Sequence, residues 1–318
     1  MIRYLSRRLA HGVLLLAGVS MLLFVFQKAA PGDFFLGMRL NPELTGQTVQ
    51  ELRAQYGLDQ PLPQRYARWL GSALRGDLGP SFAYNLPVTT LLWPRIKNTL
   101  LLSVPALLIS WLIAIPLGLL AAWRRTGWID RIFSGSTSTL LALPDVLLAL
   151  LAVLLALRTH IFPVGGMTAG TDAGQSTAGL LQHMVLPVFV LVVGSVGPLL
   201  RQVRASAIEV MDSSYFRAAQ GNGLGRTTLL FRHALPAAAN PLISLFGLSA
   251  GFLLSASILV EVIMSWPGMG PLMLEAIFGR DLFVVIGAVM ISTLLLVLGN
   301  LLADILLYFC DPRIRVQS

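Results

Sequence analysis

Six apolar segments, each long enough to cross a lipid bilayer, dominate this chain. They lie at about 9–29, 98–123, 133–157, 184–203, 241–264 and 283–309. A helix of roughly 20 apolar residues crosses a hydrocarbon layer, and at this length only helices satisfy their own backbone hydrogen bonds in lipid. Hydrophobic residues make up 55% of the chain and charged residues 12%, too few to enclose one soluble core. The sequence therefore predicts an all-α integral membrane protein, with six transmembrane helices in a single membrane domain, 1–318.

The distribution of arginine predicts the orientation, because short cytoplasmic loops carry an excess of positive side chains. If the N-terminus is inside, the inner segments contain Arg3, Arg7, Arg8, Arg124, Arg125, Arg131, Arg201, Arg204, Arg217, Arg226, Arg232, Arg313 and Arg315. The two short outer loops contain only Arg158 and Arg280. We therefore expect both termini to be cytoplasmic. The net charge of +8 follows from this topology, so the expected surrounding partner is membrane lipid and not nucleic acid.

The first outer loop, 30–97, is the longest region expected outside the bilayer. A capping box at Thr48 and Glu51 predicts a short helix at 49–56. A second helix, at 63–75, has one aromatic and apolar face. This helix either lies on the membrane surface or packs against the outer ends of the spans. A Trp-Pro-Gly turn at 266–268 predicts another interfacial helix after the fifth span.

The residues give little support to enzyme chemistry. A phosphate-binding Walker loop requires a lysine directly after glycine, and the two lysines, Lys28 and Lys97, follow other residues. The histidines lie far apart and lack the spacing of metal ligands: His11, His160, His183 and His233. We expect no catalytic residue, no metal site and no cofactor on this chain.

Two carboxylates within the predicted spans are candidates for a solute pathway, because charges in a membrane usually face an interior or water. Asp145 follows Pro144 halfway along the third span, where it can attract a cationic group of a solute. Alternatively, it caps backbone groups freed by the proline or stays protonated. Glu261, near the outer end of the fifth span, either gates the pathway, pairs with a partner subunit or makes a structural hydrogen bond.

The cytoplasmic loop at 204–240 contains a polar, Gly-rich block, Asp212 to Pro236. Asp212 or Ser213 can cap a short helix over 215–220, and the glycines after it can end that helix. A second amphipathic stretch, Thr228 to Ala234, leads to the next span. A loop that only fixes topology is the alternative. The length and internal caps of the block favour a docking element for a partner protein.

The predicted docking helix combines aromatic and arginine side chains, which anchor protein interfaces, with small alanines that allow close approach. The residues assigned to this element are Tyr215, Phe216, Arg217, Ala218, Ala219, Gln220, Gly221, Gly223 and Leu224.

This block resembles the EAA motif of permease subunits in bacterial ABC importers, in which Glu-Ala-Ala is followed by a glycine and later by Leu-Pro. Here the motif is Arg217-Ala218-Ala219, Gly223 and Leu235-Pro236. Arg217 replaces the acidic residue. A Tyr-x-Arg-x-Ala pattern is similar to the dipeptide/oligopeptide/nickel branch of these importers.

Other segments resemble the same branch, in particular its DppB/OppB type, and the resemblance covers nearly the whole chain. These segments are PGD at 31–33, YGLDQPLPQRY at 56–66, GDLGPSF at 76–82, SWPGMG at 265–270 and DPRIR at 311–315.

The resemblance implies a type I ABC importer permease fold in the bacterial inner membrane. It also implies a second homologous permease subunit, two cytoplasmic ATPases that bind ATP and Mg²⁺, and an external solute-binding protein. Residues 215–223 would be the coupling helix that docks on an ATPase, and 228–236 would support it. The implied solute is a dipeptide, an oligopeptide or a nickel chelate. An ion-gradient-driven transporter or channel subunit is the alternative function, but it leaves the capped cytoplasmic helix unexplained.

Overall fold

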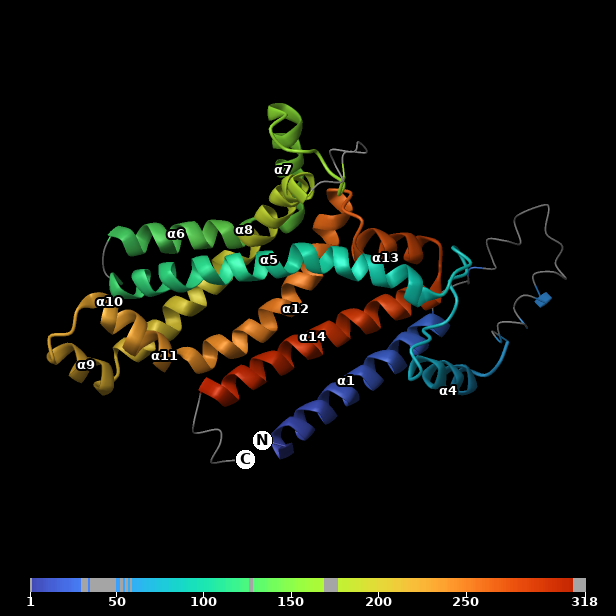
Figure 1. Cartoon of the computed structure of the whole chain (residues 1–318), viewed down its shortest axis with the longest axis horizontal. Helices are drawn as coiled ribbons and strands as arrows, with labels where there is room; N and C mark the ends of the chain where they lie inside the picture. Colours follow the sequence, from blue (N-terminus) through green and yellow to red (C-terminus); the bar gives the residue numbers. More distant parts are fainter. Residues whose placement is uncertain are drawn as a thin grey trace. The chain divides into compact units, whose positions relative to one another are not determined.

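The computed structural model describes residues 2–29, 34, 50, 51, 54, 57, 59–125, 128–168 and 177–310. Their contacts divide the chain into two compact units. The larger unit contains Met1–Leu5, Thr99–Trp266 and Leu296–Ser318, and the smaller unit contains Ser6–Asn98 and Pro267–Leu295. All regular elements in the described part are helical (Figure 1).

Five helices of the described residues are long and apolar enough to span a membrane. They are α1 (Ile2–Ala29), α5 (Val88–Trp123), α8 (Thr177–Met211), α12 (Ala239–Ile263) and α14 (Leu282–Cys310). A bent pair, α6 (Trp128–Ala142) and α7 (Asp145–Thr159), gives a sixth span if it is counted as one. The helical membrane fold predicted from hydropathy is confirmed.

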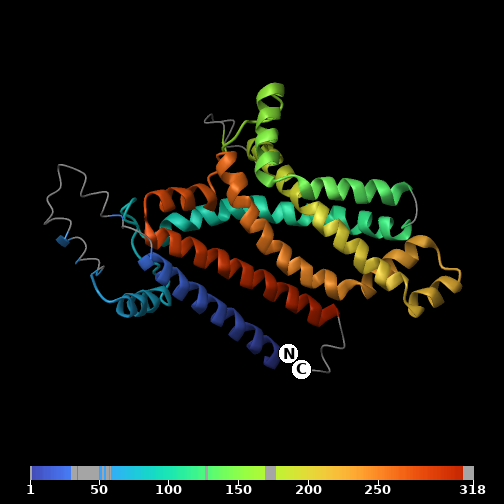
Figure 2. The same cartoon turned by 180° about the vertical axis from the view of Figure 1, so that it is seen from behind.

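The predicted third span, 133–157, is not one continuous helix. It divides at Leu143 and Pro144, and the axes of α6 and α7 differ by 92° (Figures 1 and 2). Pro144 has an extended backbone, with φ −64° and ψ 139°. Proline donates no backbone hydrogen bond and disfavours helical geometry in the residue before it, which explains a break at this position.

In the larger unit, α6, α7 and α12 all pack against α8. The face of α7 that is buried consists of alanines, Ala149, Ala152 and Ala156, at helical spacing. The helices α5 and α8 also approach closely at Gly118, which has no side chain. A β-carbon at this position would lie only 2.7 Å from Cγ1 of Val203. The core of this unit is therefore built on close helix–helix contact around α8.

In the smaller unit, the helix predicted at 63–75 corresponds to α4 (Leu62–Ala73). Its aromatic face packs on α1, with ring centroids of Tyr66 and Trp69 at 5.3 and 5.2 Å from that of Phe24. Of the two placements expected for this helix, the structure shows packing on a span. Most of the helix predicted at 49–56 lies outside the described residues.

The smaller unit also contains α13 (Met269–Phe278), which follows the Trp-Pro-Gly turn. A buried carboxylate joins the end of this helix to the segment before α5. Asp281 Oδ2 accepts hydrogen bonds from Ser81 Oγ at 2.5 Å and from the Ala83 amide at 2.9 Å. The GDLGPSF segment is thereby fixed to the turn between α13 and α14.

Candidate functional site

The polar cytoplasmic block folds around a two-turn helix, α9 (Ser214–Gly221). Of the two candidate caps, Ser213 caps the helix: its Oγ accepts a hydrogen bond from the Phe216 amide at 3.3 Å and donates one to the Val210 carbonyl at 2.6 Å. A serine in this position satisfies backbone amides that the helix itself cannot pair. The helix is therefore defined at its start by its own sequence.

The two faces of α9 differ sharply in exposure. Phe216 and Ala219 are 3% and 7% exposed and belong to the apolar core of the larger unit. Tyr215 is 55% exposed, and the other outward residues are Arg217, Ala218 and Gln220. This burial indicates that Phe216 and Ala219 attach α9 to its own chain, and their contact with a partner stays a prediction.

The end of α9 follows the glycine pattern. Gly221 is the last helical residue, and Gly223 has a φ of +72°, a conformation that glycine adopts without strain. The Gly223 amide donates to the Gln220 carbonyl at 3.1 Å. Leu224, the next residue, is 37% exposed. This turn leads the chain from α9 into the helical stretch at 226–237.

The amphipathic stretch predicted at 228–234 is an unusual helix. α10 (Arg226–Thr228) continues into a π-helix, η2 (Leu229–Ala234), and then α11 (Leu235–Ala237). Leu229, Leu230 and Ala234 of η2 are buried, while the Tyr215 hydroxyl lies 3.0 Å from Nδ1 of His233. A π-helix is rare and frequently found at functional positions. Here it supports α9 from one side.

Two contacts attach this block to the end of α5. Arg125 Nη1 donates to Asp212 Oδ2 at 2.7 Å, and the Arg226 guanidinium lies 5.6 Å from the centre of the Trp123 ring. Arg217 also donates to the Asp212 carbonyl at 2.9 Å. Figures 1 and 2 show α9 and α10 at the end of the larger unit where α5 ends and α6 begins. The block is thus attached to both α5 and α8.

The Arg125–Asp212 pair should make the order of α9 depend on pH. The hydrogen bond from Arg125 holds the pKa of Asp212 below its usual range. The pair therefore stabilises the fold above the ordinary carboxyl pKa of about 4, and this contribution is lost as pH falls through the lowered folded-state value. Hydrogen exchange of the α9 amides, corrected for intrinsic rates, should rise severalfold in Asp212→Asn and lose its acid-dependent component. Both side chains are about half exposed, so a large effect on global stability would contradict this interpretation.

Asp145 lines a cavity of about 320 Å³ in the larger unit, between α7, α8 and α12. It is the first residue of α7, and Pro144 is the preceding cap residue. The other lining residues are Val190, Leu191, Gly194, Ser195, Pro198, Leu199, Ser249, Phe252, Leu253, Ala256 and Val260. Asp145 therefore lines a pocket between these helices that opens at the surface of the unit, where Phe252 is 76% exposed. Pro144 is exposed and sets the position of α7 without lining the pocket.

Glu261 has a different environment. It is fully buried, and its carbonyl accepts a hydrogen bond from the Trp266 amide at 2.8 Å. The neighbouring Val260, and not Glu261, lines the cavity that contains Asp145. Of the roles considered for Glu261, this burial favours a structural role at the end of α12, while gating of the pathway and pairing with a partner subunit stay predictions.

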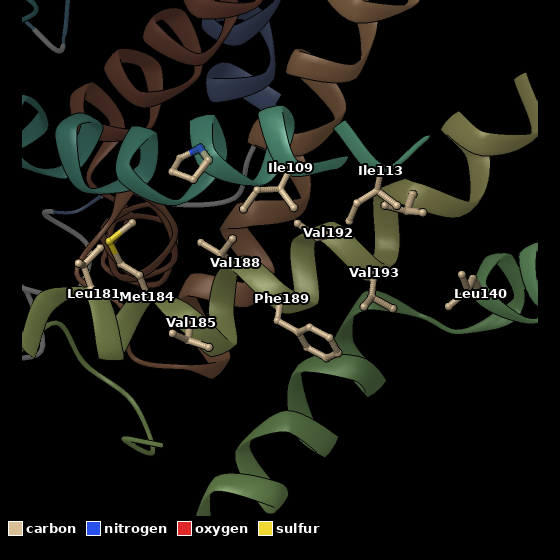
Figure 3. A pocket seen from close by; sticks show the side chains of 12 residues that line it. Ile109, Ile113, Leu140, Leu181, Met184, Val185, Val188, Phe189, Val192 and Val193 are labelled. Atoms are coloured by element: carbon tan, nitrogen blue, oxygen red, sulfur yellow. The ribbon is translucent and has the colours of Figure 1, made fainter. Parts of the chain in front are cut away.

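A second cavity, of about 560 Å³, is bounded by α5, α6 and α8 (Figure 3). All its lining side chains are apolar: Pro105, Ile109, Ile113, Leu140, Leu181, Met184, Val185, Val188, Phe189, Val192, Val193 and Val196. Val188 and Val192 of α8 lie beside Ile109 and Ile113 of α5 (Figure 3). Such a surface suits hydrocarbon and contains no group that can recognise a polar solute.

The sequence matches two family descriptions that together cover most of its length. Residues 1–103 match the N-terminal component of binding-protein-dependent transport system membrane proteins, and residues 114–316 match the binding-protein-dependent transport system inner membrane component. The chain belongs to this family. It is a permease subunit of an ABC importer, and a multi-pass protein of the bacterial inner membrane.

Similar proteins include the oligopeptide transport system permease protein AppB of Bacillus subtilis, 34% identical over 99% of this chain and 100% of the relative. The dipeptide transport system permease protein DppB of Escherichia coli is 31% identical over 99% of each chain. Among solved structures, the inward-facing MetNI methionine ABC transporter matches with a TM-score of 0.59 and 16% identity, over 70% of this permease and 96% of that chain. This last likeness concerns the fold alone.

Membership of the family places this permease in a transporter complex with ATPase subunits. Sequence reasoning found α9 and Asp145 but missed the attachment of α9 to α5. Arg125 was assigned only to topology and Asp212 only to capping, since residues 87 positions apart carry no local pattern that joins them. The cation–aromatic contact between Trp123 and Arg226 was missed for the same reason.

Proposed function

We propose that this permease forms the membrane pathway for peptides or a related small solute, such as a nickel chelate, delivered by an external solute-binding protein. The full-length relatives named as oligopeptide and dipeptide permeases support the solute class. A second, homologous permease subunit would complete the pathway. ATP and Mg²⁺ would bind to the partner ATPases, and this chain would contribute no cofactor site.

The observation that carries the proposal is the outward face of α9. The helix is capped by Ser213, attached by Phe216, and exposes Tyr215, Arg217 and Ala218 on its other side. A rigid helix with an aromatic, a cationic and a small residue on one face has the features of a docking surface. We assign it as the coupling helix on which an ATPase subunit binds, with both termini on the same, cytoplasmic side.

The attachments of α9 indicate how force from the ATPases reaches the membrane helices. Movement of α9 is transmitted to α8 through the short connection at Asp212, and to α5 through Arg125. Through η2 and α11 it also reaches the start of α12. These are the helices that bound the two cavities. ATP-driven closure of the partners would thereby switch the pathway between inward- and outward-facing states.

Reconstitution of the complete importer tests this function. Proteoliposomes would contain this permease, its homologous partner permease and the cognate ATPases, with the solute-binding protein added outside. We expect uptake of a labelled dipeptide to require internal ATP and the binding protein, and to be unaffected by a protonophore. Loss of uptake on mutation of the Walker lysine in the ATPase is the matched control. Uptake driven by an ion gradient without ATP would support the alternative transporter class instead.

A further inference from the structure

The cavity between α7, α8 and α12 has a distinctive chemistry: Asp145 is the one ionisable side chain among its lining residues. Most of the wall is aliphatic, with Phe252 as its single aromatic residue. A carboxylate in an otherwise apolar chamber attracts a positive charge more strongly than the same group in water, because the surroundings screen it less.

Two features of the fold determine where the Asp145 carboxylate lies: the start of α7 and a glycine on α8. The break at Pro144 makes Asp145 the first residue of α7, where the amide dipoles of the first helical turn favour a negative charge. On the opposite wall α8 has Gly194, whose missing side chain leaves the space occupied by the carboxylate. A β-carbon at Gly194 would collide with Oδ1 of Asp145.

Two serines also line the cavity, Ser195 on α8 and Ser249 on α12. The Ser195 hydroxyl donates to the Leu191 carbonyl at 2.8 Å, and the Ser249 hydroxyl donates to the Phe246 carbonyl at 2.8 Å. Ser249 also accepts from Nε1 of Trp111 at 3.0 Å. The Ser195 hydroxyl also lies 2.6 Å from that of Ser110, so both serines of the lining are hydrogen-bonded within the protein. The Asp145 carboxylate is therefore the charged acceptor that the cavity offers to a ligand.

We propose that this cavity is a site for the ammonium group of the transported solute, such as the amino terminus of a peptide. An ammonium group has a positive charge, three donors and no acceptor, which suits a carboxylate in an otherwise apolar wall. The volume of about 320 Å³ is at the small end of ligand pockets, so the site accommodates one residue of a peptide and not a whole oligopeptide. The naming of the solute rests on the proposed peptide-importer function, while the preference for a cation rests on the cavity itself.

Cysteine labelling in the assembled importer tests the charge preference. Cys310 is the only cysteine of this chain, so Cys310→Ser gives a background in which one new thiol can be followed. Ala256 lines the cavity, whereas the adjacent Ser255 is exposed and is not a lining residue. Ala256→Cys and Ser255→Cys would each be treated with a cationic trimethylammonium and an anionic sulfonate methanethiosulfonate reagent.

We expect the Ala256→Cys thiol to react faster with the cationic reagent, and Asp145→Asn to lower the cation-to-anion rate ratio about tenfold. Asp145→Glu should retain the preference, and the ratio at Ser255→Cys should not depend on Asp145. Alanyl-alanine should slow the cationic reaction at Ala256→Cys, and N-acetyl-alanyl-alanine should not. Since labelling requires no ATP and no transport, this result is independent of the uptake experiment.

Several outcomes would overturn the site. An unreactive Ala256→Cys thiol would show that the cavity is closed to solutes, and an unchanged ratio in Asp145→Asn would show that the carboxylate does not act on it. Equal protection by the two peptides would exclude recognition of the amine. Loss of the second permease from purified Asp145→Asn complexes would show that Asp145 pairs with that subunit instead. Normal ATP-dependent dipeptide uptake alongside any of these results would leave the importer function intact.

Discussion

Replacing Ala218 with tryptophan should release the ATPase subunits from the purified importer. Ala218 is exposed on the outward face of α9, so the larger side chain meets no obstacle within its own chain. At a close-packed interface, however, an added indole ring forces the two surfaces apart. We expect solute-stimulated ATP hydrolysis to fall about thirtyfold or more, the size of effect typical of a central interface position. Pull-down of the ATPases and hydrolysis in proteoliposomes measure it.

Ala218→Ser is the matched control for this substitution, because serine keeps the position small. It should retain both ATPase binding and transport. Membrane insertion and thermal stability of Ala218→Trp in detergent should equal those of the unmodified permease, since the site is on the surface. If Ala218→Trp purifies with a full complement of ATPase and normal stimulated hydrolysis, the docking surface lies elsewhere than on α9.

The spans were predictable because lipid imposes a simple requirement on the sequence. Each crossing segment needs about 20 apolar residues in a helix, whatever its neighbours are. The break of the third span was not predictable from that requirement. Prolines also lie inside α8, at Pro187 and Pro198, where the helix continues through them. Packing against neighbouring helices decides whether a proline is absorbed or ends the helix, and hydropathy contains no record of packing.

In the docking block, the start of α9 could likewise be predicted from local sequence, whereas the contacts of its side chains could not. Serine or aspartate can cap a helix, so the sequence predicted the start of α9 within one residue. In the structure Ser213 is the cap, whereas the Asp212 carboxylate pairs with the distant Arg125, a contact that local sequence does not reveal. Similarly, Tyr215 and Phe216 are both suited to an interface by composition. Only the packing of α9 against the rest of the larger unit shows that Phe216 is buried and Tyr215 exposed.

Replacing Phe216 with alanine therefore distinguishes the two roles for this ring. The side chain is 3% exposed and lies in the core with Leu229 and Leu230 of η2. Removing a buried phenylalanine costs about 3–5 kcal/mol. Because α9 has only two turns, we expect this loss to appear as local opening, with hydrogen exchange of the α9 amides faster by about a hundredfold or more. Phe216→Leu, which keeps most of the volume, should change exchange far less.

Tyr215, the exposed neighbour of Phe216, provides the control for this prediction. Tyr215→Ala removes one hydrogen bond to His233 and should leave the α9 amides protected to within about tenfold, while weakening ATPase binding. Phe216→Ala should disorder the helix first and lose ATPase binding as a consequence, so excess ATPase should restore both binding and α9 protection by mass action. If Phe216→Ala instead weakens binding while α9 exchange stays slow, the ring contacts the ATPase directly, as composition alone suggested, and the burial of Phe216 does not describe the assembled importer.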